Sequence, residues 1–202
     1  MFFLIGVLSM LITKNTSPYA IIMLAGLGLG WIGDYFLHAK PSNTYFAIGF
    51  TSFLIGHIVY IVCFTRALPK LFEGYNQFDL SEIIAGVSIL AVAFFIAIFV
   101  IKMKFNPAYY KYAVIVYAFI LITMVVKSAS LGIRLCLSGA ENGLLTAIVL
   151  SAGSVLFLLS DASLAVILFG GYGKSYPLKI FNIITYFWGQ VLLASSILFI
   201  NI

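Results

Sequence analysis

Residues 142–170 read NGLLTAIVLSAGSVLFLLSDASLAVILFG, and the only charged side chain among them is that of Asp161. At a rise of about 1.5 Å per residue, a helix of ~20 residues crosses the roughly 30 Å hydrocarbon layer of a bilayer. This stretch therefore predicts a membrane-spanning helix that carries a carboxyl group inside the membrane.

The composition of the whole chain agrees with this interpretation. Of its 202 residues, 63% are hydrophobic and only 8% are charged, and the mean hydropathy is +1.16. Soluble domains carry about 25% charged residues, so a soluble fold of this length could not cover its surface. Disordered chains have the opposite composition, with low hydrophobicity and high charge. The chain is predicted to be an integral membrane protein.

Seven apolar segments can be marked, at about 2–13, 19–38, 44–66, 80–104, 109–135, 142–170 and 177–200. Six reach the length of a membrane span, whereas the first is expected to be a partial one. Continuous apolar runs of this length are not typical of barrel strands, in which apolar and polar residues alternate over about ten positions. The predicted fold is an all-α, polytopic bundle of about seven transmembrane helices, with a single integral membrane domain over residues 1–202. The longest gap, Ala67–Asp79, contains Pro69.

The net charge is +5, and most of the basic residues lie in the gaps between apolar segments. Such positions favour contact with lipid head groups over binding of nucleic acid. With seven spans, one side collects six basic residues, Lys40, Lys102, Lys104, Lys111, Lys174 and Lys179. The other side collects four, Lys14, Arg66, Lys70 and Arg134. The excess of basic residues predicts that the first side is cytoplasmic. The protein is expected to be multi-pass and, if the source is bacterial, to lie in the cell membrane. The oligomeric state is not predicted.

Two sequence patterns are interpreted as packing features. Gly28, Gly30 and Gly33 match G-x-G-x-x-G, but the dinucleotide fingerprint requires a βαβ unit that is not predicted here. Gly26 and Gly30 also form G-x-x-x-G, the spacing that lets membrane helices approach closely. The two cysteines lie in apolar segments without a metal-binding or disulfide spacing.

Polar residues inside the predicted spans are the candidates for function. A charged group at the bilayer centre costs ~3 kcal/mol or more, so Asp34 and Asp161 each need an explanation. The same segments also contain His57, Lys127, Asn182, Tyr186 and Gln190. Counting helical rise from the lysine-rich side places Asp34 about 6 Å deep, Asp161 and Tyr186 about 14 Å, and His57 and Gln190 about 20 Å. Four segments thus contribute polar groups to one half of the membrane, which predicts a shared water-filled cavity, while Lys127 lies nearer the other side.

Several uses of these residues are open. Paired carboxyl groups in a low-dielectric pocket differ in proton affinity, so one can act as acid and the other as base in adding water across a bond. A serine triad with Ser52, Ser160 or Ser163 lacks the G-x-S-x-G elbow. A metal site could use Asp34, His38, His57 and Asp161, but His38 falls at an interfacial helix end, and neither a metal nor another cofactor is expected. Asn182, Tyr186 and Gln190 could also be interhelical hydrogen-bonding residues only.

The motifs resemble those of a known family in order and spacing. They are Gly33-Asp34, Phe53-x-x-Gly56-His57-x-x-Tyr60, Ser160-Asp161-x-x-x-Ala165 and Tyr186-x-x-x-Gln190, with Tyr112 or Tyr117 followed by Met124 as a further stretch. Over nearly its whole length the chain is similar to the YhhN-type lysoplasmalogenases. Members of that family usually have eight predicted helices, whereas this sequence shows seven apolar segments and is expected to lack a counterpart of the family's first helix.

The resemblance implies hydrolysis of the vinyl ether bond of a lysophospholipid, lysoplasmalogen, to a fatty aldehyde and glycerophosphoethanolamine or glycerophosphocholine. It implies that Asp34 and Asp161 are the catalytic pair, in an order that stays open. His57, Tyr60, Asn182, Tyr186 and Gln190 would position water or substrate, and Lys127 or Arg134 would hold the phosphate. The alternatives are a small proton-coupled membrane carrier and a metal-dependent, ceramidase-like hydrolase, for which two histidines are too few.

Overall fold

The computed structural model describes residues 2–39, 42–73, 75, 78–105, 108 and 110–202. Its helices are α1 (Phe2–Thr13), α2 (Pro18–Ala39), α3 (Asn43–Leu71), α4 (Leu80–Phe95), α5 (Tyr110–Leu137), α6 (Gly143–Phe169) and α7 (Tyr176–Ser195). A π-helical segment, Ile96–Val100, continues α4, and a 3₁₀ turn, Ser196–Leu198, continues α7. The described residues form no strand, which confirms the all-α prediction.

Six of the helices are long and apolar enough to cross a membrane, namely α2 to α7. The remaining helix, α1, has 12 residues and is too short for a span. This pattern confirms the predicted transmembrane helix bundle, in which the first segment is only partial.

Two predicted boundaries are wrong. Helix α3 continues to Leu71, so Pro69 lies inside the helix and not in the following gap. A proline in the last turn removes one backbone donor, and burial of Ala67 and Leu68 in the core holds this turn in place. The predicted segment 80–104 is also too long, because the helix ends before Lys102, whose φ of 55° is incompatible with a continuing right-handed helix.

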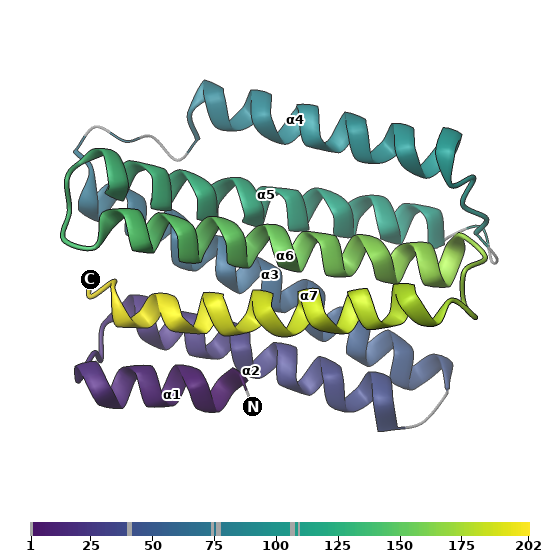
Figure 1. Cartoon of the computed structure of the whole chain (residues 1–202), viewed down its shortest axis with the longest axis horizontal. Helices are drawn as coiled ribbons and strands as arrows, with labels where there is room; N and C mark the ends of the chain where they lie inside the picture. Colours follow the sequence, from purple (N-terminus) through teal and green to yellow (C-terminus); the bar gives the residue numbers. More distant parts are fainter. Residues whose placement is uncertain (1, 40–41, 74, 76–77, 106–107, 109) are drawn as a thin grey trace.

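The helices lie side by side with roughly parallel axes (Figure 1). Helix α3 packs against α2 and α5, and α6 packs between α5 and α7. Helix α1 contacts α2 and α7, which places the N-terminal part of the chain next to its C-terminal part. The side chain of Asn15 fixes this neighbourhood, since its amide donates hydrogen bonds to the carbonyl oxygens of Ile197 and Ile200.

Close approach of α2 and α3 depends on small residues. A Cβ atom at Gly26 would lie 2.3 Å from the ring of Tyr60, and a Cβ atom at Gly33 would lie 2.7 Å from the ring of Phe53. Glycine at both positions therefore lets aromatic side chains of α3 pack directly on the α2 backbone. The prediction that Gly26 serves helix packing is confirmed.

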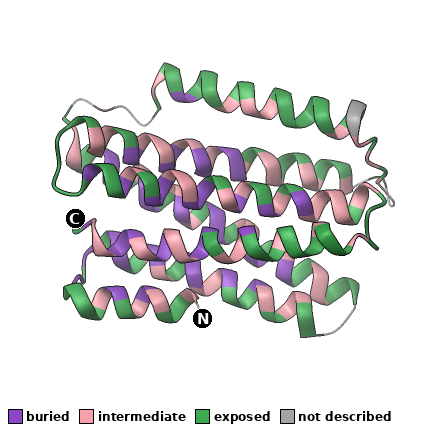
Figure 2. Ribbon diagram, viewed as in Figure 1, coloured by how far each residue is buried: buried purple, intermediate pink, exposed green. Residues whose placement is uncertain are grey.

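Helix α4 is peripheral. Glu82 is the one buried residue of α4, a helix that the structure describes throughout (Figure 2). The apolar residues of α4 are mostly exposed, as expected for a helix that faces lipid on most of its circumference. Among the described helices, α4 packs against α5 and against the π-helical segment that follows it.

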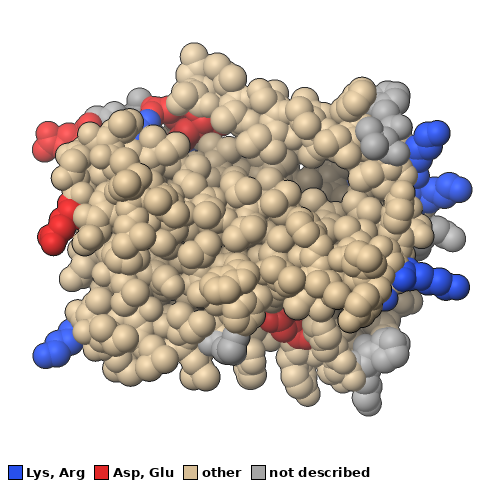
Figure 3. All heavy atoms as spheres, in the orientation of Figure 1, with Lys and Arg blue, Asp and Glu red and all other residues tan. Residues whose placement is uncertain are grey.

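Charge is distributed unevenly between the two ends of the bundle. Basic side chains project from one end, and most acidic side chains lie at the other end (Figure 3). Lys102, Lys104, Lys111, Lys174 and Lys179 belong to connections or helix ends at the basic end, and Lys40 is outside the described residues. This arrangement matches the asymmetry on which the predicted orientation is based.

Candidate active site between the helices

Three helices bring a histidine, a tyrosine and an aspartate together. The hydroxyl group of Tyr117 on α5 donates a hydrogen bond to Oδ2 of Asp161 on α6, at 2.6 Å. The Nε2 atom of His57 on α3 lies 3.2 Å from the same oxygen and 2.9 Å from the hydroxyl oxygen of Tyr117. The single proton of Tyr117 is directed to Asp161, so in the Nε2–H tautomer of His57 one N–H is shared between the Asp161 oxygen and the hydroxyl oxygen of Tyr117. One carboxylate oxygen thus accepts from two side chains.

The second aspartate belongs to a chain of hydrogen bonds that crosses three helices. Tyr60 on α3 donates to Oε1 of Gln190 on α7 at 3.2 Å, and Nε2 of Gln190 lies 3.5 Å from the hydroxyl oxygen of Tyr186. Tyr186 in turn donates to Oδ2 of Asp34 on α2 at 2.8 Å. All three donors are oriented in one direction, toward the carboxyl group of Asp34. Gly30 leaves room for this chain, since a Cβ atom there would lie 3.1 Å from Nε2 of Gln190.

The two groups form one site. The ring of Phe157 lies between them, with its centroid 4.8 Å from that of His57 and 5.5 Å from that of Tyr186. The structure therefore brings together Asp34, His57, Tyr60, Asp161, Tyr186 and Gln190, all predicted from the sequence as site residues.

Burial differs within the site. His57, Tyr60 and Gln190 are 1% exposed, whereas the Asp161 side chain is 12% exposed and Asp34 is half-buried. The Nδ1 atom of His57 is buried and has no hydrogen-bond partner in the described part of the chain. Among the same residues, Oδ1 of each aspartate accepts no hydrogen bond. Each carboxyl group thus has one oxygen held by protein donors and one oxygen available for another molecule.

The side chain of Asn182, a candidate substrate contact, is hydrogen-bonded to α6. Its amide donates to the carbonyl oxygen of Ser160 at 2.7 Å, and the Ser160 hydroxyl group donates to the carbonyl oxygen of Asn182 at 3.2 Å. These reciprocal bonds join α7 to α6 one residue before Asp161. Asn182 therefore holds the backbone that carries the aspartate. The serines do not reach His57 either, since Ser160 and Ser163 donate to helix carbonyl oxygens.

Lys127 and Arg134 lie apart from the aspartates, in contact with acids at the start of α4. The ammonium group of Lys127, 0% exposed, lies 2.7 Å from Oε2 of Glu82 and 2.8 Å from the hydroxyl oxygen of Tyr75. Arg134 forms an ion pair with Asp79. Burial and the hydrogen bond to the Glu82 carboxylate raise the pKa of Tyr75, which keeps this hydroxyl group a neutral donor. These contacts attach α4 to α5.

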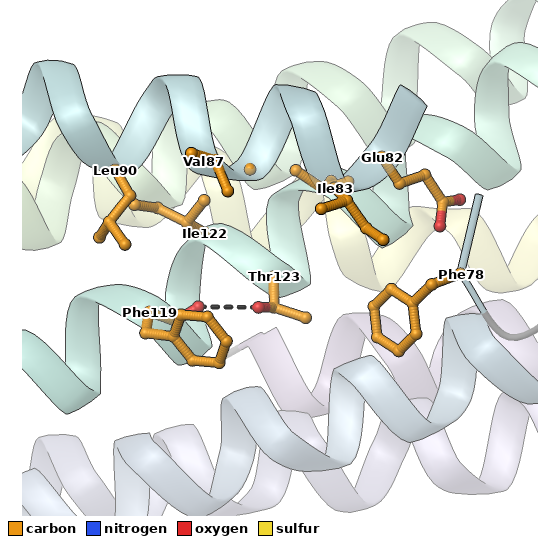
Figure 4. Close-up of a pocket in the computed structure, with 10 residues that line it drawn as sticks. Phe78, Glu82, Ile83, Val87, Leu90, Phe119, Ile122 and Thr123 are labelled. Carbon is orange, nitrogen blue, oxygen red and sulfur yellow. Dashed lines mark hydrogen bonds between the residues drawn. The ribbon is translucent and has the colours of Figure 1, made fainter. Parts of the chain in front are cut away.

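A cavity of about 150 Å³ lies between α4 and α5, next to this ion pair (Figure 4). Its lining is almost entirely apolar and consists of Phe78, Glu82, Ile83, Gly86, Val87, Leu90, Phe119, Ile122, Thr123 and Val126. No residue of the aspartate site contributes to it. The cavity is thus a separate feature of the lipid-facing side of α5.

The residues considered for a metal site are not grouped. Among the described residues, no set of three or more His, Cys, Asp or Glu side chains lies close enough to hold a metal ion. His38 is exposed, and its Nδ1 donates to the carbonyl oxygen of Asp34 at 2.8 Å. Its imidazole is therefore held at the helix end instead of facing His57.

The sequence did not decide which tyrosine belongs to the site, and it did not indicate that Glu82 is buried. It named Tyr112 and Tyr117 as alternatives, and the structure places Tyr117 in the site and Tyr112 on the surface, 69% exposed. The helical depth count would have favoured Tyr117, because this residue lies about 10 Å from the start of α5. Glu82 lies near the start of an apolar segment, where the sequence does not mark it as unusual, yet its side chain is buried against Lys127.

The comparisons with known proteins identify a family for the chain. The family model described as "YhhN family" matches residues 1–197 of the chain. The comparisons with curated proteins and with solved structures gave no match. The family match covers nearly the whole length and includes every residue of the aspartate site, so the chain belongs to the YhhN family of membrane proteins.

Proposed function

We propose that the protein is a membrane-embedded hydrolase that cleaves the vinyl ether bond of lysoplasmalogens. The products are a fatty aldehyde and glycerophosphoethanolamine or glycerophosphocholine. The observation that carries the proposal is the pair of intramembrane carboxyl groups, Asp34 and Asp161, each held through Oδ2 by a tyrosine and each with a second oxygen without a protein donor. Membership of the YhhN family supports it.

The chemistry of the bond fits this pair. A vinyl ether hydrolyses when an acid protonates its β-carbon, which produces an oxocarbenium ion that water then captures. The reaction needs a proton donor, a group that takes a proton from water, and negative charge near the cation. Two carboxyl groups of unequal proton affinity provide these functions in a low-dielectric site.

The position of the site fits a lipid substrate. Asp34 and Asp161 each lie in the C-terminal half of a helix that is long enough to cross the membrane, and both helices end next to lysine-containing connections. A single-chain lipid could keep its alkenyl chain in hydrocarbon while its glycerophosphate head group faces that basic end. Lys127 and Arg134 are not included in the proposed substrate site, because both are paired with acids of the α4 region.

Release of aldehyde by purified protein tests the proposal. The protein in detergent is given lysoplasmalogen and, as matched controls, the 1-acyl and 1-alkyl lysophospholipids with the same head group. Aldehyde release from the vinyl ether substrate alone is expected, because neither control forms an oxocarbenium ion on protonation of carbon. Fatty-acid release from the 1-acyl lipid, or no aldehyde from folded protein, would contradict the proposal.

A proton-coupled carrier is the second candidate. It is favoured by the chain from Tyr60 through Gln190 and Tyr186 to Asp34, since hydrogen-bonded chains ending on an intramembrane acid are typical of proton relays. Proteoliposomes with an internal pH indicator separate the two functions. Lysolipid-dependent proton flux without aldehyde would favour the carrier.

A further inference from the structure

The two aspartates differ in the number of hydrogen bonds that they accept. Oδ2 of Asp161 accepts from Tyr117 and from Nε2 of His57, whereas Oδ2 of Asp34 accepts from Tyr186 alone. Donors directed at a carboxylate stabilise its ionised form, and each further donor adds to that effect.

Two neighbouring carboxyl groups of low solvent exposure do not both ionise readily. Both groups would carry negative charge in one site of low dielectric, where like charges repel each other more strongly than in water. A proton shared between the pair therefore resides on the group with fewer donors. Oδ1 of Asp34 accepts no hydrogen bond from the described residues, so this oxygen can carry the proton while Oδ2 accepts from Tyr186.

We infer that the roles of the pair are fixed by these donors, with Asp34 as the protonated acid and Asp161 as the ionised base. The assignment of roles rests on the proposed vinyl ether hydrolysis, whereas the assignment of the proton does not. Tyr117, His57 and Tyr186 are positioning residues in this scheme, because each acts on the substrate through an aspartate.

The reaction balances with these roles. Asp34 transfers its proton to the β-carbon, where a C–H bond forms as the C=C π bond breaks, and Asp34 becomes a carboxylate. Water adds to the oxocarbenium carbon and gives a proton to Asp161, which yields a hemiacetal. When the hemiacetal collapses, its hydroxyl proton returns to Asp34, the C–O bond to glycerol breaks, and the glycerol oxygen takes the proton from Asp161. The site returns to its starting state.

Infrared spectroscopy tests the location of the proton without any substrate. A protonated carboxyl group absorbs through its C=O stretch in a region where carboxylates do not, and this band shifts on transfer to D₂O. Four other acids are not expected to contribute, because Asp79 and Glu82 are ion-paired and Glu73 and Glu141 are exposed. At neutral pH the wild-type protein in detergent should therefore show a band from a single residue.

Matched variants identify that residue. Asp34→Asn should remove the band, and the exposed control Glu141→Gln should keep it. Tyr186→Phe should move the band to higher frequency, because the C=O group loses its donor, and Tyr117→Phe should leave the frequency unchanged. The tyrosine variants also give an answer if an aspartate variant fails to fold. A band that moves in Tyr117→Phe instead of Tyr186→Phe, or the absence of a band from the wild type, would overturn the inference even if aldehyde is released. Failure of the aldehyde assay would leave the infrared result intact.

Discussion

Tyr117 and Asp161 are separated by 44 residues in the chain, yet the hydroxyl group of Tyr117 lies 2.6 Å from Oδ2 of Asp161. This contact joins α5 to α6 at the depth of the candidate active site. A hydrogen bond to a charged group contributes about 1.5–3 kcal/mol. The orientation and charge of Asp161 therefore depend on a residue of a different helix.

Replacing Tyr117 by phenylalanine should slow aldehyde release by ~10-fold or more, because the carboxylate loses its shortest hydrogen bond. The matched control is Tyr112→Phe, a surface residue of the same helix, which should keep wild-type turnover. Steady-state kinetics of both purified variants check the expectation. Equal activity of the two variants would remove Tyr117 from the site.

Replacing Asp161 by asparagine should reduce turnover by at least ~10²-fold while the detergent-extracted protein stays folded. Asparagine keeps the volume of the side chain but cannot exchange a proton with water. Circular dichroism and size-exclusion chromatography report the fold, and the aldehyde assay reports activity. Glu141→Gln, at an exposed position, is the control and should keep wild-type turnover. Near-normal turnover in Asp161→Asn would show that Asp161 is not catalytic.

Extended chelation followed by dialysis against metal-free buffer should leave turnover unchanged. The proposed mechanism uses carboxyl groups for proton transfer, and the two histidines lie apart, with His38 on the surface and His57 buried. Activity is measured before and after treatment and again after addition of zinc. Loss on chelation with recovery by zinc would favour the metal-dependent alternative.

Replacing Lys127 by methionine should lower the free energy of unfolding by ~3–5 kcal/mol, because the buried Glu82 carboxylate loses its cation. The double variant Lys127→Met/Glu82→Gln should recover most of that loss. Lys111→Met, an exposed lysine near the start of the same helix, is the control. Thermal unfolding in detergent provides the comparison.

The same variant tests whether Lys127 contacts substrate. Turnover per folded molecule and KM should be unchanged in Lys127→Met, since its ammonium group is paired with Glu82 and Tyr75. A KM raised several-fold at constant kcat would instead place Lys127 at the phosphate of the substrate.

Replacing Gly26 by alanine should destabilise the protein by ~1–3 kcal/mol, because the new methyl group would overlap the ring of Tyr60. Movement of that ring would also break its hydrogen bond to Gln190. Gly28→Ala, on the same helix, is the matched control, since a Cβ atom there would lie 3.8 Å from the nearest side chain. Equal melting temperatures of the two variants would contradict the packing role of Gly26.

Most site residues could be found from the sequence because polar groups are rare and costly inside apolar helices. That rule singled out Asp34, His57, Asp161, Tyr186 and Gln190, which the structure places in one site. It could not select Tyr117 on its own, because tyrosine is also common at membrane interfaces. It left open whether Asn182 contacts substrate or only joins helices, and the structure shows that its amide donates to the backbone carbonyl of Ser160.

The length and apolarity of the segments determined by themselves that the chain forms membrane-spanning helices. A backbone in hydrocarbon must satisfy its hydrogen bonds within each helix, so no knowledge of the neighbouring helices is required. Only the tertiary structure decided which polar groups meet. Whether Glu82 pairs with Lys127, or Tyr117 with Asp161, depends on the rotation of each helix about its axis and on which helices are neighbours. Both are set by packing contacts between residues far apart in the chain, such as Gly26 against Tyr60, which no single segment encodes.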